Sequence, residues 1–174
     1  MENIDQNLTP NDIAFIGLCN EYCKALFNAP NMEKEDFIGQ MLKLLPRLYI
    51  SASDIHTSIY EEPTGGVVED KMDEALYDTV RNPIAALLGE DDTYLEVFQE
   101  DMKYSDTPIG ASISEGLADL MQVTYNLVET VKDLPTEMIA DALAEVREDF
   151  DGYWSQTLCN VMRPLNQLYY NLQS

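Results

Sequence analysis

The stretch 112–134, SISEGLADLMQVTYNLVETVKDL, carries the clearest fold signal in the chain. Ser112 and Glu115 match a capping box, in which two side chains satisfy each other's free backbone N–H groups where a helix begins. Mostly apolar positions then recur at intervals of three and four: Ile113, Leu117, Leu120, Thr124, Leu127, Val131 and Leu134. The opposite side carries Glu115, Asp119, Gln122, Asn126, Glu129 and Asp133. This spacing predicts an amphipathic helix with one side packed on a core and the other in water.

The same helical spacing extends through most of the chain. Further helices are predicted to begin at Pro10, after Asn31, at about residue 71 and after Pro135. Prolines inside these helices should kink or split them, and the last region, 136–172, should bend or break near Gly152 or Pro164: the internal prolines are Pro46, Pro83 and Pro164. We predict an all-α fold, a compact bundle of five to six helices with proline kinks, in a single domain over residues 1–174.

Residues 89–111 depart from the helical spacing. They hold seven acidic residues, Glu90, Asp91, Asp92, Glu96, Glu100, Asp101 and Asp106, and end in Thr107-Pro108-Ile109-Gly110. Residues 93–98 could form a short strand or a helical turn. We predict one long acidic loop packed over one side of the bundle, and connections of this length often have a function.

The charge of the chain excludes some classes of partner. It has 32 Asp and Glu residues against 10 Lys and Arg, a formal net charge of −22. Such a surface repels nucleic-acid phosphates and anionic lipid, so we expect neither nucleic acid nor membrane as a partner. A basic protein is the partner that this charge favours.

The first residues and the cysteines bear on the compartment. Residues 1–5 lack the positive charge and apolar stretch of a secretory signal, and no apolar run reaches the ~18 residues of a membrane span. Cys19, Cys23 and Cys159 are an odd number of cysteines in a chain with no export signal. We therefore expect reduced thiols and a cytoplasmic protein.

The sequence contains few of the motifs that mark a metal site, a cofactor site or a catalytic nucleophile. His56 is the only histidine, and no Glu-x-x-His pair of the di-iron type is present. Cys19 and Cys23 share a helix face without a recognisable pair to complete a zinc site, so we expect buried free thiols. The sequence also lacks a Gly-x-Ser-x-Gly motif and a phosphate-binding glycine loop. We expect no metal site and no cofactor.

The carboxylates supply an alternative, enzymatic hypothesis. If two helices face each other, Glu115 and Asp119 could oppose Glu145, Glu148 and Asp149, and hold Mg²⁺ for hydrolysis of a nucleotide or phosphate ester. The stretch 114–120 is similar to the second motif of the all-helical nucleotide pyrophosphohydrolases. It differs in spacing, because its two carboxylates are four residues apart where three is expected, and in the chain order of the motifs.

The favoured hypothesis is a non-enzymatic acidic interaction or adaptor module. Its predicted binding residues lie on the polar side of the 112–134 helix and in the acidic loop: Glu115, Asp119, Gln122, Asn126, Asp91, Asp92 and Glu96. Trp154, Tyr153 and Arg81 are candidates to line a pocket. A third hypothesis is that the acidic surface mimics nucleic acid. The oligomeric state stays open.

A family resemblance rests on two segments. The run Leu88-Gly89-Glu90-Asp91-Asp92-Thr93-Tyr94-Leu95-Glu96-Val97-Phe98, followed by Ser114-Glu115-x-Leu117-Ala118-Asp119-Leu120, resembles a bacterial domain-of-unknown-function family, number 5063. The resemblance covers most of the chain and implies a small, all-helical cytoplasmic protein. It brings no activity and no catalytic residue. Gly116 departs from the pattern, which would have a larger polar residue at that position.

Overall fold

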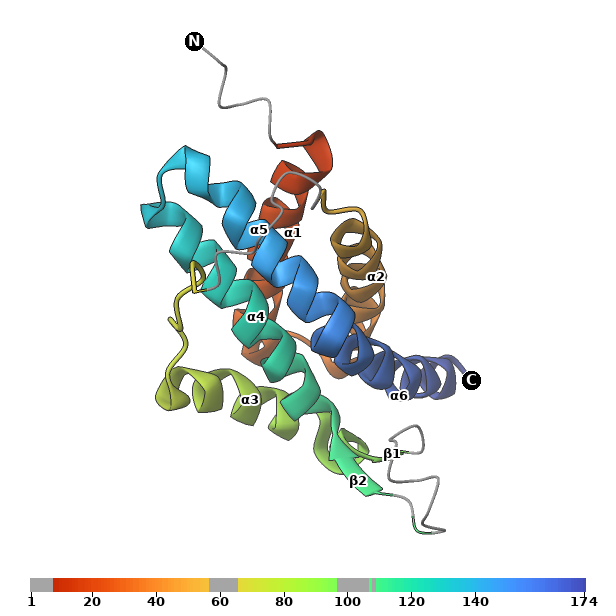
Figure 1. Ribbon diagram of the computed structural model, residues 1–174. Helices are drawn as coiled ribbons and strands as arrows, with labels where there is room; N and C mark the ends of the chain where they lie inside the picture. Colours follow the sequence, from red (N-terminus) through yellow and green to blue (C-terminus); the bar gives the residue numbers. More distant parts are fainter. Residues whose placement is uncertain (1–7, 57–65, 97–106, 108) are drawn as a thin grey trace.

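The computed structural model describes residues 8–56, 66–96, 107 and 109–174 (Figure 1). The described part contains six α-helices: α1 (Pro10–Phe27), α2 (Lys34–Ser53), α3 (Glu74–Leu88), α4 (Ile113–Asp133), α5 (Ile139–Asp149) and α6 (Ser155–Gln173). Short 3₁₀ turns occupy Ala29–Asn31, Gly89–Asp92 and Thr136–Met138, and a π-helix spans Phe150–Trp154. The strands β1 (Thr93–Glu96) and β2 (Ile109–Ser112) form the sheet of the described part. The predicted all-α bundle is confirmed.

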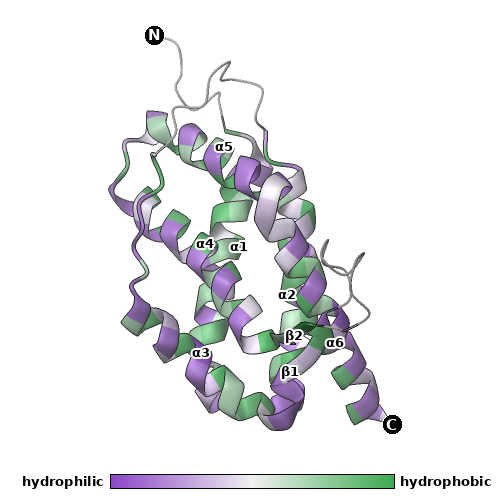
Figure 2. Ribbon diagram, turned by 60° about the horizontal axis from the view of Figure 1, so that its bottom comes forward, coloured by the Kyte–Doolittle hydropathy of each residue, from purple (hydrophilic) through white to green (hydrophobic). Residues whose placement is uncertain are grey.

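Four helices enclose the core. α1 packs against α2 and α4, and α6 packs against the same two helices, so these four form a closed ring around it. α3 packs against α4 and against the 3₁₀ turn Ala29–Asn31. Hydrophilic and hydrophobic residues alternate along the helices, as expected of helices that bury one side (Figure 2). The largest fully buried side chains include Trp154, Tyr22, Phe15, Phe37, Met41 and Ile84.

The first helix begins as its sequence indicates. Thr9 and Asp12 form a reciprocal capping box, with Thr9 Oγ1 accepting from the Asp12 N–H at 3.1 Å and Asp12 Oδ2 accepting from the Thr9 N–H at 2.9 Å. Asp12 is buried, and its other oxygen accepts the His56 N–H at 3.2 Å. The cap therefore also ties the start of α1 to the residues that follow α2.

None of the internal prolines splits its helix. α2 runs through Pro46, α3 through Pro83 and α6 through Pro164 without interruption. A proline removes a single backbone donor, and tertiary packing of the neighbouring apolar side chains is enough to keep each helix intact. The interruption of the last region falls at the π-helix, which contains Gly152. The predicted bend or break is confirmed at Gly152, and of the two alternatives given for the prolines, the split does not occur.

The ends of the acidic segment form a hairpin. β1 and β2 pair antiparallel, from Thr93 opposite Ser112 to Glu96 opposite Ile109. The prediction of one loop over 89–111 is therefore wrong at both ends, and the strand alternative is right for 93–96. Residues 97–106 and 108, with Glu100, Asp101 and Asp106, lie outside the described residues.

Gly116 lies where α4 crosses α6. A Cβ atom at this position would stand 2.3 Å from Cγ1 of Val161, far inside van der Waals contact. Gly116 is buried, so its departure from the family pattern lies on the packed side of α4 and leaves the acidic side unchanged. Among the described helices, none has both the length and the apolar composition that crossing a membrane requires.

Candidate functional site: an acidic pocket beside α4

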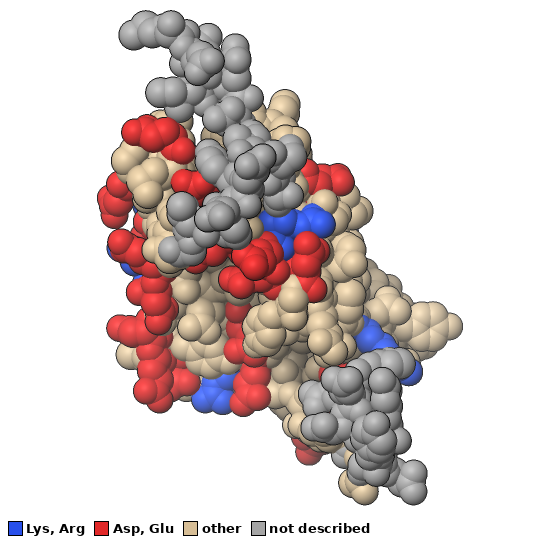
Figure 3. Space-filling view, viewed as in Figure 1, with Lys and Arg blue, Asp and Glu red and all other residues tan. Residues whose placement is uncertain are grey.

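A pocket of about 380 Å³ opens on the polar side of α4. Its walls come from α4, from α5 with the π-helix, and from residues 66–73, an irregular segment that we call the strap. The lining residues are Val68, Glu69, Asp70, Asp119, Gln122, Val123, Asn126, Glu145, Val146, Asp149 and Tyr153. Figure 3 shows Asp and Glu side chains gathered on this face of the molecule.

The strap is held against α4 and α5 by side chains. Three side-chain oxygens accept hydrogen bonds from five of its backbone N–H groups. Glu145 Oε2 accepts from Val67 (3.0 Å) and Val68 (3.2 Å), Thr130 Oγ1 from Glu69 (3.0 Å), and Asn126 Oδ1 from Lys71 (2.8 Å) and Met72 (3.1 Å). An irregular segment needs such partners for its backbone donors, so these bonds fix one wall of the pocket.

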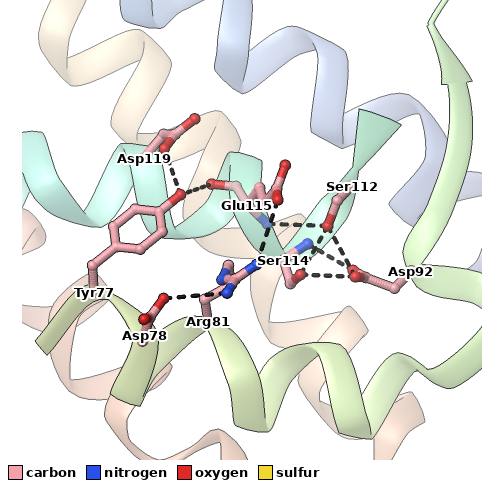
Figure 4. Close-up of polar contacts among 8 residues, drawn as sticks. All are labelled: Tyr77, Asp78, Arg81, Asp92, Ser112, Ser114, Glu115 and Asp119. Carbon is pink, nitrogen blue, oxygen red and sulfur yellow. Dashed lines mark hydrogen bonds and ion pairs between the residues drawn. The ribbon is translucent and has the colours of Figure 1, made fainter. Parts of the chain in front are cut away.

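A second set of contacts joins α3 to the first two turns of α4 (Figure 4). The Tyr77 hydroxyl donates to Asp119 Oδ1 at 2.7 Å, and Arg81 forms ion pairs with Glu115 (3.4 Å) and Asp78 (3.2 Å). Ser112 Oγ accepts the Glu115 N–H at 3.3 Å as the N-cap of α4. The Glu115 carboxylate pairs with Arg81 instead of returning to the cap, so only half of the predicted capping box forms.

Two carboxyl groups of the pocket have raised pKa values. Burial raises the pKa of Asp119 and the charge of Glu115 raises it further, while the hydrogen bond from Tyr77 acts in the opposite direction. Burial also raises the pKa of Asp149, with further contributions from Glu145 and Glu148. Both shifts mean that a negative charge is costly here and that a bound cation would be stabilised.

The structure brings together some of the predicted catalytic carboxylates. Asp119, Glu145 and Asp149 line the pocket, whereas Glu115 and Glu148 are not among the lining residues. In the described part of the chain, no three His, Cys, Asp or Glu side chains lie close enough to hold a metal ion. α4 and α5 thus bring three of the five predicted carboxylates to one pocket. Val68, Val123 and Val146 line the same pocket.

Apart from Glu115, which pairs with Arg81, the predicted binding residues divide into two groups. Asp119, Gln122 and Asn126 line the pocket. The acidic segment uses its carboxylates within the fold: Asp92 accepts from the Ser114 N–H at 2.7 Å, Asp91 pairs with Lys34, and Glu96 is buried and accepts from the Tyr94 hydroxyl at 3.2 Å. The Asp92 contacts are drawn in Figure 4.

Of the three predicted pocket residues, only Tyr153 lines the acidic pocket. Its side chain is 59% exposed. Trp154, the next residue, belongs to the core, where its Nε1–H donates to Val146 O at 3.1 Å and its ring packs on Phe150 with centroids 4.5 Å apart. Arg81 is absent from the described lining and instead joins α3 to α4. Trp154 and Arg81 therefore do not line this pocket.

The cysteines behave as small apolar residues in α1. Cys19 and Cys23 are buried and unpaired, and burial raises the pKa of both thiols, that of Cys23 to about 11. The expectation of buried free thiols is confirmed for these two, and Cys159 is exposed.

A second pocket of about 330 Å³ lies between β1 and α6. It is lined by Tyr94, Leu95, Glu96, Gln156, Cys159, Asn160, Arg163 and Pro164. Sequence reasoning missed this pocket, and it also missed Glu69 and Asp70 of the strap. Glu69 and Asp70 precede the helix predicted from about residue 71, and a connecting segment carries no spacing that shows which way its side chains point.

Comparison with known proteins identifies the family. The profile of the family described as domain of unknown function DUF5063 matches residues 6–171. The crystal structure of protein BF1032 from Bacteroides fragilis is similar to this chain, with a TM-score of 0.76 and 31% sequence identity over 92% of each chain. No match is found among the curated proteins. The resemblance seen in the sequence is confirmed, and the chain belongs to the bacterial DUF5063 family.

Proposed function

We propose that the protein is a non-enzymatic interaction module that holds a basic segment of a partner protein in the acidic pocket. One observation carries this proposal: the described residues that line the pocket include five carboxylates and neither Lys nor Arg. Glu69 has an ion pair with Lys71 at 2.7 Å, and the other four carboxylates are Asp70, Asp119, Glu145 and Asp149.

The chemistry of the pocket lining favours a cationic side chain as its occupant. Val68, Val123 and Val146 lie among the carboxylates. Lysine and arginine pack an apolar stem on such residues while their charged end reaches carboxylates. A divalent cation such as Mg²⁺ needs several oxygen ligands close together, so apolar side chains in the lining favour an organic cation.

The charge of the whole chain supports the same proposal. A net charge of −22 attracts a basic partner from a distance and speeds the encounter, with a rate that falls as salt rises. We also propose a cytoplasmic location, because Cys19 and Cys23 are buried as unpaired thiols.

A peptide titration tests the proposal. A short peptide of alternating glycine and basic residues should bind at about 50 mM salt and weaken strongly at about 300 mM. The double variant Asp119→Asn/Asp149→Asn should lower the affinity roughly tenfold or more, because it removes two charges from the pocket. The control Glu33→Gln/Asp36→Asn changes the net charge equally at the start of α2, outside the pocket lining. Equal losses in both variants would contradict a site at the pocket.

The Mg²⁺-dependent hydrolase is a second candidate, supported by the shared position of Asp119, Glu145 and Asp149 in one pocket. A thermal-shift series with Mg²⁺, Mn²⁺, Ca²⁺ and nucleotides at matched ionic strength separates the two functions. A ligand at 100 times its dissociation constant adds about 2.7 kcal/mol to the free energy of unfolding. A shift that needs metal and nucleotide together, and that Glu115→Ala/Asp119→Ala loses, would favour the hydrolase. Equal small shifts in the wild type and in this variant would favour the interaction module.

A further inference from the structure

We infer that the side chain that the acidic pocket takes from its partner is an arginine, stacked against the ring of Tyr153; this inference rests on the proposed function. Lysine and arginine carry the same charge, but only arginine has a planar guanidinium that stacks on an aromatic face while bonding to a carboxylate. The choice between them therefore depends on whether the pocket offers a ring beside a carboxylate.

The π-helix supplies that ring. Asp149 is the last residue of α5 and Tyr153 lies four residues later, inside the π-helix, and both line the pocket. The two residues therefore face the same opening, although the wider turn of the π-helix separates them along the chain. The Tyr153 side chain is 59% exposed, so its ring is accessible to a group that enters the pocket.

The chain holds one of its own arginines in a similar way on the same segment. The guanidinium carbon of Arg147 lies 5.6 Å from the centroid of the Phe150 ring. Arg147 Nε donates to Asp151 Oδ2 at 3.1 Å, and its Nη1 donates to Ala52 O at 2.8 Å. A ring, a carboxylate and a carbonyl oxygen thus surround this guanidinium.

The pocket offers the same three kinds of group to an external arginine. Tyr153 supplies the ring, Asp149 and Asp119 supply carboxylates, and Gln122 supplies an amide oxygen. Valines in the lining suit the three methylene groups of the arginine stem. A guanidinium loses less hydration free energy than an ammonium on entering such a site, which further favours arginine.

Matched peptides test the inference. Three peptides of one sequence, with a central arginine, lysine or citrulline among glycines and alanines, are titrated at low salt while backbone amide NMR shifts are followed. The arginine peptide should bind at least roughly threefold more tightly than the lysine peptide, because both cations are attracted to a ring but only the planar guanidinium stacks on it while bonding to a carboxylate. Citrulline has the arginine shape without the charge, and its peptide should show no binding.

Variants of Tyr153 locate the source of the preference. Tyr153→Ala should remove the advantage of arginine over lysine, and Tyr153→Phe should keep it. Because the side chain is mostly exposed, both variants should fold. Equal binding of arginine and lysine peptides, or an equal loss of both in Tyr153→Ala, would overturn the inference and leave the proposed function standing. If neither peptide binds, the proposed function fails, and the inference fails with it.

Discussion

The Tyr77 hydroxyl donates a hydrogen bond of 2.7 Å to Asp119, a carboxylate of the acidic pocket. Tyr77 lies on α3 and Asp119 on α4, so this bond connects α3 to the pocket. Both groups are half-buried, which makes the bond matter for the stability of the fold and for the charge in the pocket.

Tyr77→Phe removes this hydrogen bond and keeps the ring. The free energy of unfolding should fall by about 1 kcal/mol, because the acceptor is charged but only half-buried. The pKa of Asp119 should rise further, since the Tyr77 hydrogen bond is the contribution that lowers it. Urea denaturation and a carboxyl NMR titration measure the two effects. A pKa of Asp119 that does not move would contradict this account.

Asp119→Asn tests the pH dependence of stability. The pKa of Asp119 is raised in the folded state, so its protonated form is favoured by folding. The stability that the protonated Asp119 contributes is fully present below the pKa of an aspartate in the unfolded chain, about 3.9. It is lost as the pH rises through the higher pKa that Asp119 has in the folded protein. Asparagine cannot ionise and can still accept from Tyr77, so Asp119→Asn should gain stability relative to wild type between pH 4 and pH 7.

The gain should be about 1 kcal/mol or less at pH 7, because the group is partly exposed. Denaturation curves at several pH values measure it, with Asp36→Asn on the exposed start of α2 as the control for net charge. The same pH trend in both variants would assign the effect to general repulsion and not to Asp119.

Asp92→Ala removes a cap of α4. Asp92 accepts from the Ser114 N–H at 2.7 Å, the Ser114 hydroxyl at 2.8 Å and the Ser112 hydroxyl at 2.9 Å. Losing a helix cap with this number of bonds should cost about 1–3 kcal/mol. The neighbouring Asp91→Ala breaks only a partly exposed ion pair with Lys34 and should cost less than about 1 kcal/mol. Similar midpoints in urea for the two variants would show that Asp92 does not act as a cap.

Gly116→Ala should destabilise the contact between α4 and α6. The added methyl group would meet Val161 Cγ1 at 2.3 Å, and overpacking of this kind costs about 1–3 kcal/mol. Val161→Ala should recover a large part of that loss in the double variant, although by itself it leaves a cavity. A double-mutant cycle in urea measures the coupling, and simple additivity would contradict the close contact.

The helical elements and the acidic side of α4 could be predicted from the sequence, because both depend on spacing within one helix. The 112–134 stretch places Asp119, Gln122 and Asn126 on one side, and all three line the pocket. The bend or break predicted near Gly152 or Pro164 likewise corresponds, at Gly152, to the interruption that the π-helix makes.

The rest of the site depends on contacts between residues distant in sequence. Glu145 accepts hydrogen bonds from backbone N–H groups 77 and 78 residues away. Arg81, 34 residues from Glu115, pairs with the carboxylate that was expected to cap α4. Asp92, which was predicted to lie in a loop, accepts the backbone N–H of Ser114, 22 residues away, and so caps α4. No spacing rule within one element predicts such pairs.

The strap limits the kind of recognition that is open to this face. Five of its backbone N–H groups already donate to Asn126, Thr130 and Glu145. An extended peptide that adds itself to an exposed backbone edge needs such donors as well as carbonyl acceptors. Those five donors are already engaged, so an incoming chain meets this wall of the pocket through its side chains, and these are mainly acceptors. A molecule that settles there must bring its own hydrogen-bond donors.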